Sequence, residues 1–148
     1  MPSFFKKSGI PFLNLKYKLW KFGPVSEELF IDLSSEPKLL ENYIEKNNDD
    51  GINFITSIVD FNDHEFSDND IELMNSVIEK FGNNSAKELI SYTHRINAPW
   101  HNSAKDNNVL ELLEKEIINN TEYLIDMSVL IGHDKRKREI YSDYIEAN

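Results

Sequence analysis

The sequence predicts a mainly α-helical α+β fold, a single helical domain with a small two- or three-stranded antiparallel sheet. Apolar residues recur at helical spacing in several capped segments, while two short segments have strand patterns. At 148 residues, with 40% hydrophobic and 11% aromatic residues, the chain has the size and composition of one domain with one core. No internal repeat or low-complexity linker divides it. We therefore expect residues 1–148 to form one domain.

Two segments have the composition of strands. Residues 15–22 alternate between two faces, and the lysines among them suit an edge strand. Gly23 and Pro24 end this strand, and Pro24 suits the first turn of a following helix because its φ is fixed. Residues 54–61 are β-branched and aromatic, which predicts a second strand. The two strands are candidate partners, and the sequence leaves their pairing open.

The first half of the chain also contains two predicted helices. In the first, apolar residues recur every four positions within residues 25–33, so that one stripe faces inward. Residues 34–37 offer a cap and a first-turn proline for the second helix, whose buried stripe lies within residues 39–44. We expect this helix to end in the polar turn 47–51.

Two helices in the middle of the chain have clear start signals. Ser67 caps the first, Asp70 occupies its third helical position, and Gly82 follows its end. Ser85 and Glu88 form a capping box for the second. The apolar face of the first helix comprises Ile71, Met74, Val77, Ile78 and Phe81.

Proline and glycine limit the remaining helices. Pro99 prevents the helix that starts at Ser85 from continuing. Beyond it, residues 109–118 and 123–131 are apolar-rich stretches that predict helices. The helix-breaking residues 119–121 separate or kink them. The inner side of the helix that starts at Ser85 comprises Leu89, Ile90 and Thr93. Gly132 is a stop signal for the stretch 123–131. A final helical stripe is formed by Ile140, Tyr141, Tyr144 and Ile145.

Charge and cysteine content restrict the function classes. Twenty-six acidic and sixteen basic residues give a formal net charge of −10, which repels a phosphate backbone. We therefore expect no direct nucleic-acid binding, and we interpret the basic run 135–138 as the exposed side of a terminal helix. The absence of cysteine fits a cytoplasmic location. From the first residues we expect neither a secretory signal nor a membrane span.

The residues that carry chemistry do not form a recognisable catalytic or metal-binding motif. No two of the four histidines have the spacing of a helical zinc site, and no Gly-x-Gly occurs. We expect each imidazole to be hydrogen-bonded near a helix end. The sequence therefore predicts a protein that is not an enzyme, with no catalytic residue, metal or cofactor. His94 is the one candidate general base.

Trp20 and Trp100 each have two interpretations. Both are large and apolar with a single N–H donor, so packing with the indole N–H bonded to an acceptor is the default role. Tryptophan is also enriched at the centres of protein interfaces. Packing is favoured for Trp100, because Pro99 fixes its approach, and the two roles are equally weighted for Trp20.

Two motifs resemble those of the Panacea domain, the family of SocA-like bacterial and phage antitoxins. In the first family motif, an aromatic-rich strand ends in Trp and is followed by a basic or polar residue, an aromatic and Gly-Pro-Val. The matching residues here are Trp20-Lys21-Phe22-Gly23-Pro24-Val25. The second family motif consists of a helix, a glycine, a Ser-Ala helix start, Thr-His and Pro-Trp. The matching residues here are Val77–Phe81, Gly82, Ser85-Ala86, Thr93-His94 and Pro99-Trp100. The resemblance covers residues 8–104, with C-terminal helices expected over 107–147.

This resemblance implies a protein that binds and neutralises a toxin, usually encoded beside it, or an adaptor that delivers the toxin to a protease. It also implies that the ten matched residues have a structural or partner-binding role. These residues are Trp20, Phe22, Gly23, Pro24, Val25, Ser85, Thr93, His94, Pro99 and Trp100.

The amino terminus departs from the family pattern. Family members usually place a helix before the aromatic strand, whereas only seven residues precede Ser8 here. Removing a packed helix exposes the apolar stripe that it covered. We therefore expect Phe4, Phe5 and Phe12, or the second subunit of a homodimer, to cover that stripe.

The acidic composition also supports a second function class. A phage-type inhibitor could present carboxylates to a host nucleic-acid-binding enzyme and so mimic the charge of DNA. This hypothesis requires the acidic side chains to gather on one part of the molecule.

Overall fold

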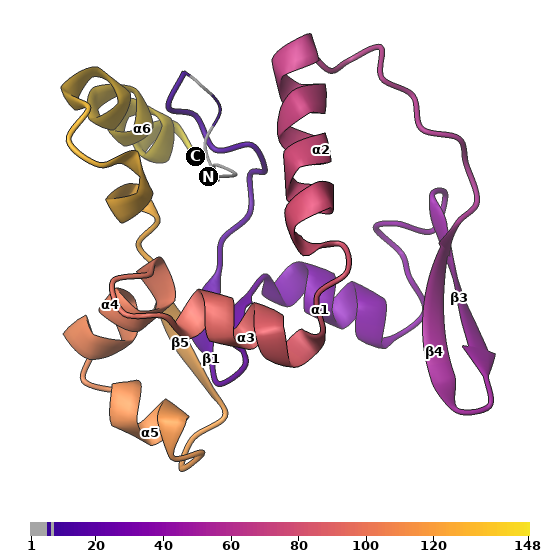
Figure 1. The fold of residues 1–148 in the computed structure, drawn as a ribbon, viewed down its shortest axis with the longest axis horizontal. Coiled ribbons are helices and arrows are strands. Elements are labelled where there is room, and N and C mark those ends of the chain that lie inside the picture. The colour runs from indigo at the N-terminus through magenta and orange to yellow at the C-terminus, as the bar shows by residue number, and fades with distance from the viewer. Residues whose placement is uncertain (1–5, 7) are drawn as a thin grey trace. The chain divides into compact units, whose positions relative to one another are not determined.

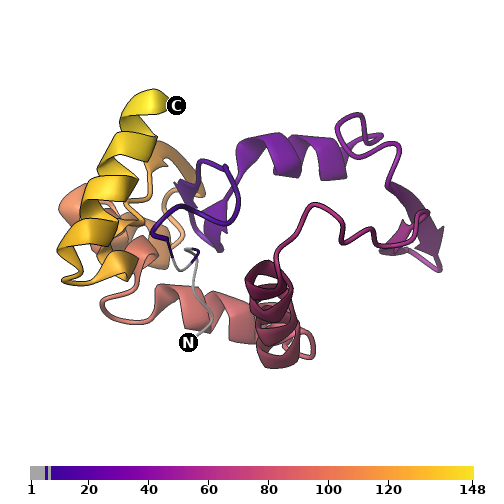
Figure 2. The same ribbon diagram turned by 90° about the horizontal axis from the view of Figure 1, so that it is seen from above.

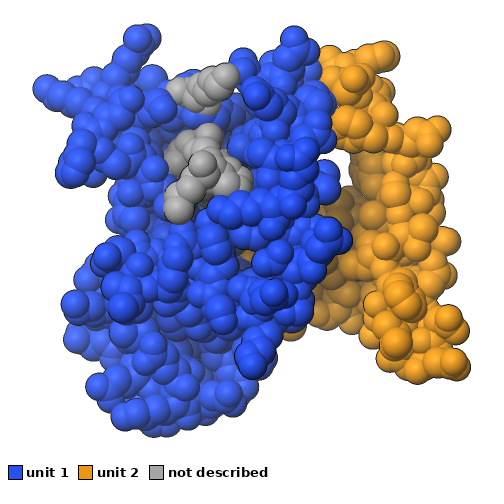
Figure 3. All heavy atoms as spheres, viewed as in Figure 1, with its two compact units in different colours: residues 1–25, 66–148 blue, residues 26–65 orange. Residues whose placement is uncertain are grey.

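The computed structural model describes residue 6 and residues 8–148. The chain forms two compact units (Figure 3). The first, which we call the core unit, comprises residues 1–25 and 66–148, and the second, the insert unit, comprises residues 26–65. Figure 1 labels their helices and strands.

A three-stranded antiparallel sheet joins the two ends of the core unit. It consists of β1 (Lys18–Trp20), β2 (Gly23–Val25) and β5 (Asn120–Leu124), in the order β2-β1-β5. The prediction that residues 15–22 form an edge strand is therefore wrong, because β5 pairs with the side of β1 that β2 leaves free.

Pro24 lies in a strand and not in the first turn of a helix. It is opposite Leu19 in β2, which is an edge strand of the sheet. An edge strand accepts proline because its outer side needs no N–H for the hydrogen-bond ladder. The following helix begins three residues later, at Glu27.

Strand β5 replaces part of the helix predicted over residues 123–131. The hydroxyl of Thr121 donates to the carbonyl oxygen of Leu19 at 2.9 Å, and the N–H of Ile125 donates to the carbonyl oxygen of Tyr17 at 2.8 Å. These contacts with a distant segment outweigh the local helical pattern. A short 3-10 helix, η1 (Ser128–Ile131), is the one helical turn in this stretch.

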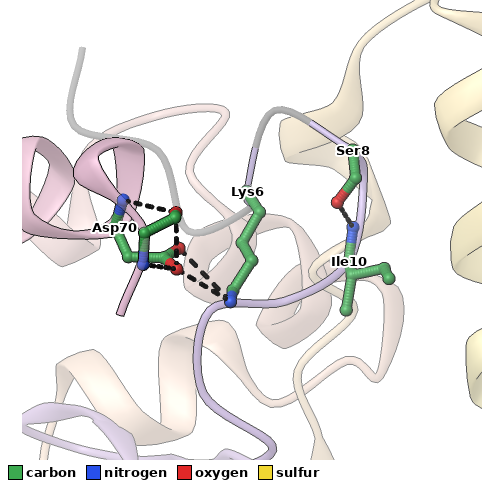
Figure 4. A network of polar contacts seen from close by, with 5 residues as sticks. Lys6, Ser8, Ile10 and Asp70 are labelled. Carbon is green, nitrogen blue, oxygen red and sulfur yellow. Dashed lines mark hydrogen bonds and ion pairs between the residues drawn. The ribbon is translucent and has the colours of Figure 1, made fainter. Parts of the chain in front are cut away.

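The two helices with capping boxes form as predicted. They are α2 (Asp68–Phe81) and α3 (Ala86–His94). In α2, the Ser67 hydroxyl accepts the N–H of Asp70, whose carboxylate accepts the N–H of Ser67 at 3.1 Å. The Lys6 ammonium is 3.2 Å from the same carboxylate (Figure 4). The Ser67 hydroxyl and N–H and the nearby Lys6 lower the pKa of Asp70.

Three helices complete the core unit, namely α4 (Pro99–Asp106), α5 (Leu110–Glu114) and α6 (Lys135–Ala147). Pro99 begins α4 at a position where no N–H is needed. The helix predicted over residues 109–118 is shorter than expected, because Lys115 and Glu116 leave the helical path. The basic run predicted to lie on a terminal helix occupies the first turns of α6.

A small hydrophobic core holds these elements together. Leu19 from β1 and Trp100 from α4 lie at its centre, with exposures of 0% and 1%. Each such side chain contributes about 1.5–3 kcal/mol when it is removed from water. The other buried members are Ala104, Val109, Leu113 and Ile125.

The insert unit consists of one helix and one hairpin. Helix α1 (Glu27–Ser34) precedes the antiparallel strands β3 (Ile44–Asp49) and β4 (Ile52–Ser57), which a tight turn connects (Figures 1 and 2). The strand predicted over residues 54–61 is confirmed only for residues 54–57, because β4 ends at Ser57. This strand pairs with β3 and not with β1, so the protein has two small sheets.

The second helix predicted after residues 34–37 is absent from the insert unit. The carboxylate of Asp32 accepts the backbone N–H groups of Lys38, Leu39 and Leu40 at 2.6, 2.9 and 3.2 Å. These bonds fix the N–H groups of three successive residues on one carboxylate, and the segment between α1 and β3 forms bends and turns. They also lower the pKa of Asp32, with Leu39 the largest contributor.

The fold class is mixed α+β, since six α-helices and two small antiparallel sheets occur among the described residues. The predicted predominance of helix fits only in part. Within residue 6 and residues 8–148, no helix is long and apolar enough to cross a membrane.

We predict that Asp32→Ala will release the turn that follows α1. Hydrogen exchange at the amides of Lys38, Leu39 and Leu40 should accelerate by about tenfold or more, because the carboxylate that protects them is gone. Glu36→Ala, which removes an exposed carboxylate from the same segment, is the control and should leave these rates unchanged. Equal rates in the two variants would contradict the assigned role of Asp32.

Candidate functional site

The two sequence motifs meet at one junction in the core unit. The indole N–H of Trp100 donates a hydrogen bond to the backbone carbonyl oxygen of Trp20 at 2.9 Å, across 80 positions of sequence. Trp100 is buried, and its single polar atom therefore has the acceptor that a buried indole requires. The bond ties the start of α4 to the end of β1.

A second contact brings the glycine of the first motif against the threonine of the second. Gly23 has a φ of +118° and is buried against α3. A Cβ atom at this position would lie 2.9 Å from the hydroxyl oxygen of Thr93. That hydroxyl is held in place because it donates to the carbonyl oxygen of Ile90 at 3.0 Å. Both the conformation and the close approach require glycine here.

His94 packs against Trp100 at the centre of the junction. The two rings are stacked, with centroids 3.6 Å apart and planes 11° from parallel. Burial lowers the pKa of His94, and the negative charge of Glu114 partly opposes this effect. The imidazole is therefore held neutral, as an aromatic packing surface for the indole.

The prediction that each imidazole is hydrogen-bonded near a helix end is wrong for two of the histidines. Among the described residues, the buried Nε2 of His94 and the buried Nδ1 of His101 have no hydrogen-bond partner. Stacking on Trp100 places the His94 ring by its faces, so its orientation does not depend on a bond at Nε2.

The remaining predicted residues lie at the starts of α3 and α4 and in and beside β2. Ser85 caps α3, Pro99 opens α4, and Pro24 and Val25 are partly buried in β2. Phe22 differs from them, because its side chain is 62% exposed in the turn between β1 and β2. The Lys21 ammonium lies 4.5 Å from the centroid of the Phe22 ring. The same ammonium pairs with the carboxylate of Glu116 at 3.2 Å.

Sequence reasoning missed several residues that build the junction. Leu19 is its most buried strand residue, and Thr121 holds β5 against it. The hydroxyl oxygen of Ser103 accepts the N–H of Asp126 at 3.0 Å, which ties α4 to the segment after β5. The alternation of residues 15–22 is a signal that could have marked Leu19, because it places this apolar residue and the lysines before it on opposite faces, whereas no local signal marks the other two.

An apolar groove lies elsewhere in the core unit, between residues 12–17 and α2. It has a volume of about 330 Å³ and is lined by Phe12, Leu13, Tyr17, Leu73, Met74, Val77 and Ile78. Phe12 was predicted to cover an apolar stripe, and it forms part of this lining. Phe4 and Phe5, predicted to share that role, lie outside the described residues, and the predicted homodimer stays a prediction.

The polar groups of the junction bond to the backbone. The Trp100 indole and the Ser103 hydroxyl each join two segments, while the Thr93 hydroxyl bonds within α3. Among the described residues, no group of three or more His, Asp or Glu side chains could hold a metal ion. The junction therefore positions the strand turn that carries Phe22.

A comparison of the sequence with protein families finds one match. The profile described as "Antitoxin SocA-like, Panacea domain" matches residues 3–101. The chain belongs to this family. The Panacea match includes both motifs and the whole insert unit, and it ends one residue after Trp100. No curated protein and no solved structure matches the chain.

We predict that Gly23→Ala will destabilise the Panacea domain by about 1–3 kcal/mol through backbone strain, with a further loss from the contact with Thr93. Chemical denaturation measures both effects. Gly132→Ala is the control, because Gly132 also has a positive φ but an added Cβ would meet nothing within 4 Å. Adding Thr93→Ala should recover part of the Gly23→Ala loss, and strictly additive losses would refute the contact.

A second prediction concerns the pH dependence of stability. The pKa of His94 lies below its usual 6.5 in the folded protein, so below pH 6.5 the unfolded chain binds the proton more readily. The contribution of neutral His94 to the free energy of unfolding should be fully present above pH 6.5. It should be lost as the pH drops toward the pKa of His94 in the folded protein. His94→Phe keeps a ring against Trp100 and cannot titrate. Denaturation midpoints measured between pH 7.5 and about pH 5 should therefore fall less in this variant, and identical pH profiles would contradict the prediction.

Proposed function

We propose that this chain is an antitoxin that binds a toxin protein encoded nearby and neutralises it by direct contact in the cytoplasm. Its membership of the SocA-like antitoxin family carries this proposal. Binding and neutralisation require a surface that recognises another protein, and they require no reaction at the interface. We propose that both units belong to one functional domain.

The junction supports the proposal through the way it fixes Phe22. Its neighbours on either side are anchored, since Lys21 pairs with Glu116 and Gly23 packs against Thr93. An exposed aromatic ring on a fixed turn loses little conformational freedom when a partner covers it. The same surface could present the toxin to a protease, which is the adaptor form of the proposal.

The distribution of charge favours a second candidate, an inhibitor that mimics the charge of DNA. Residues 26–65 contain eleven acidic and two basic residues, a formal charge of −9. The rest of the chain contains fifteen acidic and fourteen basic residues, a formal charge of −1. The acidic excess thus belongs almost entirely to the insert unit. Inhibition of a host nuclease by the purified protein is the result that would select this candidate.

A growth assay tests the antitoxin proposal. Each gene adjacent to the one for this chain is expressed in bacteria from an inducible promoter, alone and together with this chain. We expect one product to arrest growth alone and to form a complex with this chain that restores growth. The proposal fails if every adjacent product is harmless, or if this chain rescues none of them.

A Phe22→Ser variant adds a test of the junction. It should keep the melting temperature of the parent protein within about 2 °C, because the ring is exposed, and it should weaken the rescue. Tyr123→Ser, which alters an exposed aromatic residue of β5, is the control and should rescue normally. Equal rescue by the two variants would remove Phe22 from the binding surface.

A further inference from the structure

The insert unit has no hydrophobic core. Its buried residues are the polar Ser26 and Asp32, and every one of its apolar side chains is partly or largely exposed. Ten large apolar side chains have exposures between 46% and 67%, even with the whole chain present. These are Phe30, Ile31, Leu39, Tyr43, Ile52, Phe54, Ile55, Ile58, Val59 and Phe61. An apolar surface of this kind marks an association site.

The hairpin of the insert unit has two different faces. Residues opposite each other in an antiparallel pair share a face, and successive residues alternate between faces. Ile52 is opposite Asp49, Phe54 is opposite Asn47, and Thr56 is opposite Glu45. These six residues form one face, which we call the acidic face. It combines two large exposed apolar side chains with two carboxylates and no basic residue.

The opposite face of the hairpin carries the basic residue of β3. There Lys46 is opposite Ile55, and its ammonium donates to the backbone carbonyl oxygen of Ser35 at 2.9 Å. This bond uses the ammonium within the insert unit. The carboxylates of the acidic face therefore have no neutralising partner across the strands, and the face is suited to a cationic surface.

We propose that the acidic face of the β3–β4 hairpin is a second toxin-binding surface besides the turn that carries Phe22, and that the toxin offers it an apolar patch surrounded by lysine and arginine. This inference rests on the proposed antitoxin function. Ile52 and Phe54 provide the desolvated contact, while Glu45 and Asp49 at its edge guide the encounter and reject acidic partners. A formal charge of −9 over 40 residues extends this attraction beyond the contact itself.

Charge also argues against a second copy of this chain as the occupant. Two acidic faces brought together would oppose four carboxylates without a cation between them, which is unfavourable. A pure charge mimic of DNA would not need the exposed Ile52 and Phe54 on the same face. The combination of apolar and acidic side chains fits a basic protein surface.

Binding of the toxin should also order the hairpin. A two-stranded hairpin without a core is marginally stable in water, and the outer edges of β3 and β4 pair with no other strand of the described chain. A partner that covers Ile52 and Phe54 supplies the missing burial. Hydrogen exchange in residues 44–57 should therefore slow when the complex forms.

The test uses the full chain and, as the probe, the purified product of the adjacent gene that the growth assay identifies, in a catalytically inactive form. Calorimetric titration measures the affinity. The double variant Glu45→Lys/Asp49→Lys should bind about tenfold more weakly or worse. The matched control Glu139→Lys/Asp143→Lys makes the same charge change on exposed residues of α6 and should bind within about threefold of the parent.

A Phe54→Ser variant tests the apolar part of the face. It should also lose about tenfold in affinity, while Ile55→Ser, on the opposite face, should lose less. Normal binding by both Glu45→Lys/Asp49→Lys and Phe54→Ser would overturn this inference and leave the antitoxin function standing. If no adjacent product is toxic or rescued, the antitoxin function itself fails.

The stability of the chain without toxin shows whether an external partner or the core unit covers the acidic face. If the acidic face binds the toxin, Phe54→Ser should leave the melting temperature of the core unit within about 2 °C of the parent. A much larger loss of stability in the free chain would assign the covering role to the core unit and overturn the inference. Slower exchange in residues 44–57 on addition of the toxin, absent with Glu45→Lys/Asp49→Lys, is the expected positive result.

Discussion

The core unit depends on one hydrogen bond, from the Trp100 indole N–H to the Trp20 carbonyl oxygen. A buried indole without an acceptor costs about 1–3 kcal/mol, so this donor fixes where α4 can meet β1. Once that contact is made, His94 is brought over the Trp100 ring and Thr93 against Gly23. The family motifs are thus the two halves of one packing arrangement, which explains why they lie far apart in sequence.

The two units are stabilised in different ways. The core unit buries Leu19, Trp100 and Leu113 almost completely. The insert unit buries no apolar side chain, and its chain path between α1 and β3 follows from three N–H groups bonded to Asp32. Hydrogen bonds to a carboxylate stabilise this turn, but they supply no apolar burial. The hairpin that we assign to toxin capture therefore lies in the unit that has no hydrophobic core.

The sequence predicted those elements whose decisive contacts lie within four residues. The capping boxes of Ser67 with Asp70 and of Ser85 with Glu88 are of this kind. The sequence did not predict β5, because this strand depends on Leu19 and Tyr17, more than 100 positions away. It did not predict the turns after α1 either, where the Asp32 carboxylate of the preceding helix accepts backbone N–H groups. At the junction the residues were identifiable from the motifs. Their mutual contacts were not, since stacking and close approach leave no periodic pattern.

Pro24 has a consequence for how other molecules can reach the core unit. It occupies the edge strand β2 and has no N–H to offer. An incoming peptide that tried to extend the sheet there would find an interrupted ladder of donors, so templated growth of the sheet is blocked on this side. The hairpin strands contain no proline, and a ligand chain could align along their backbone without that obstacle.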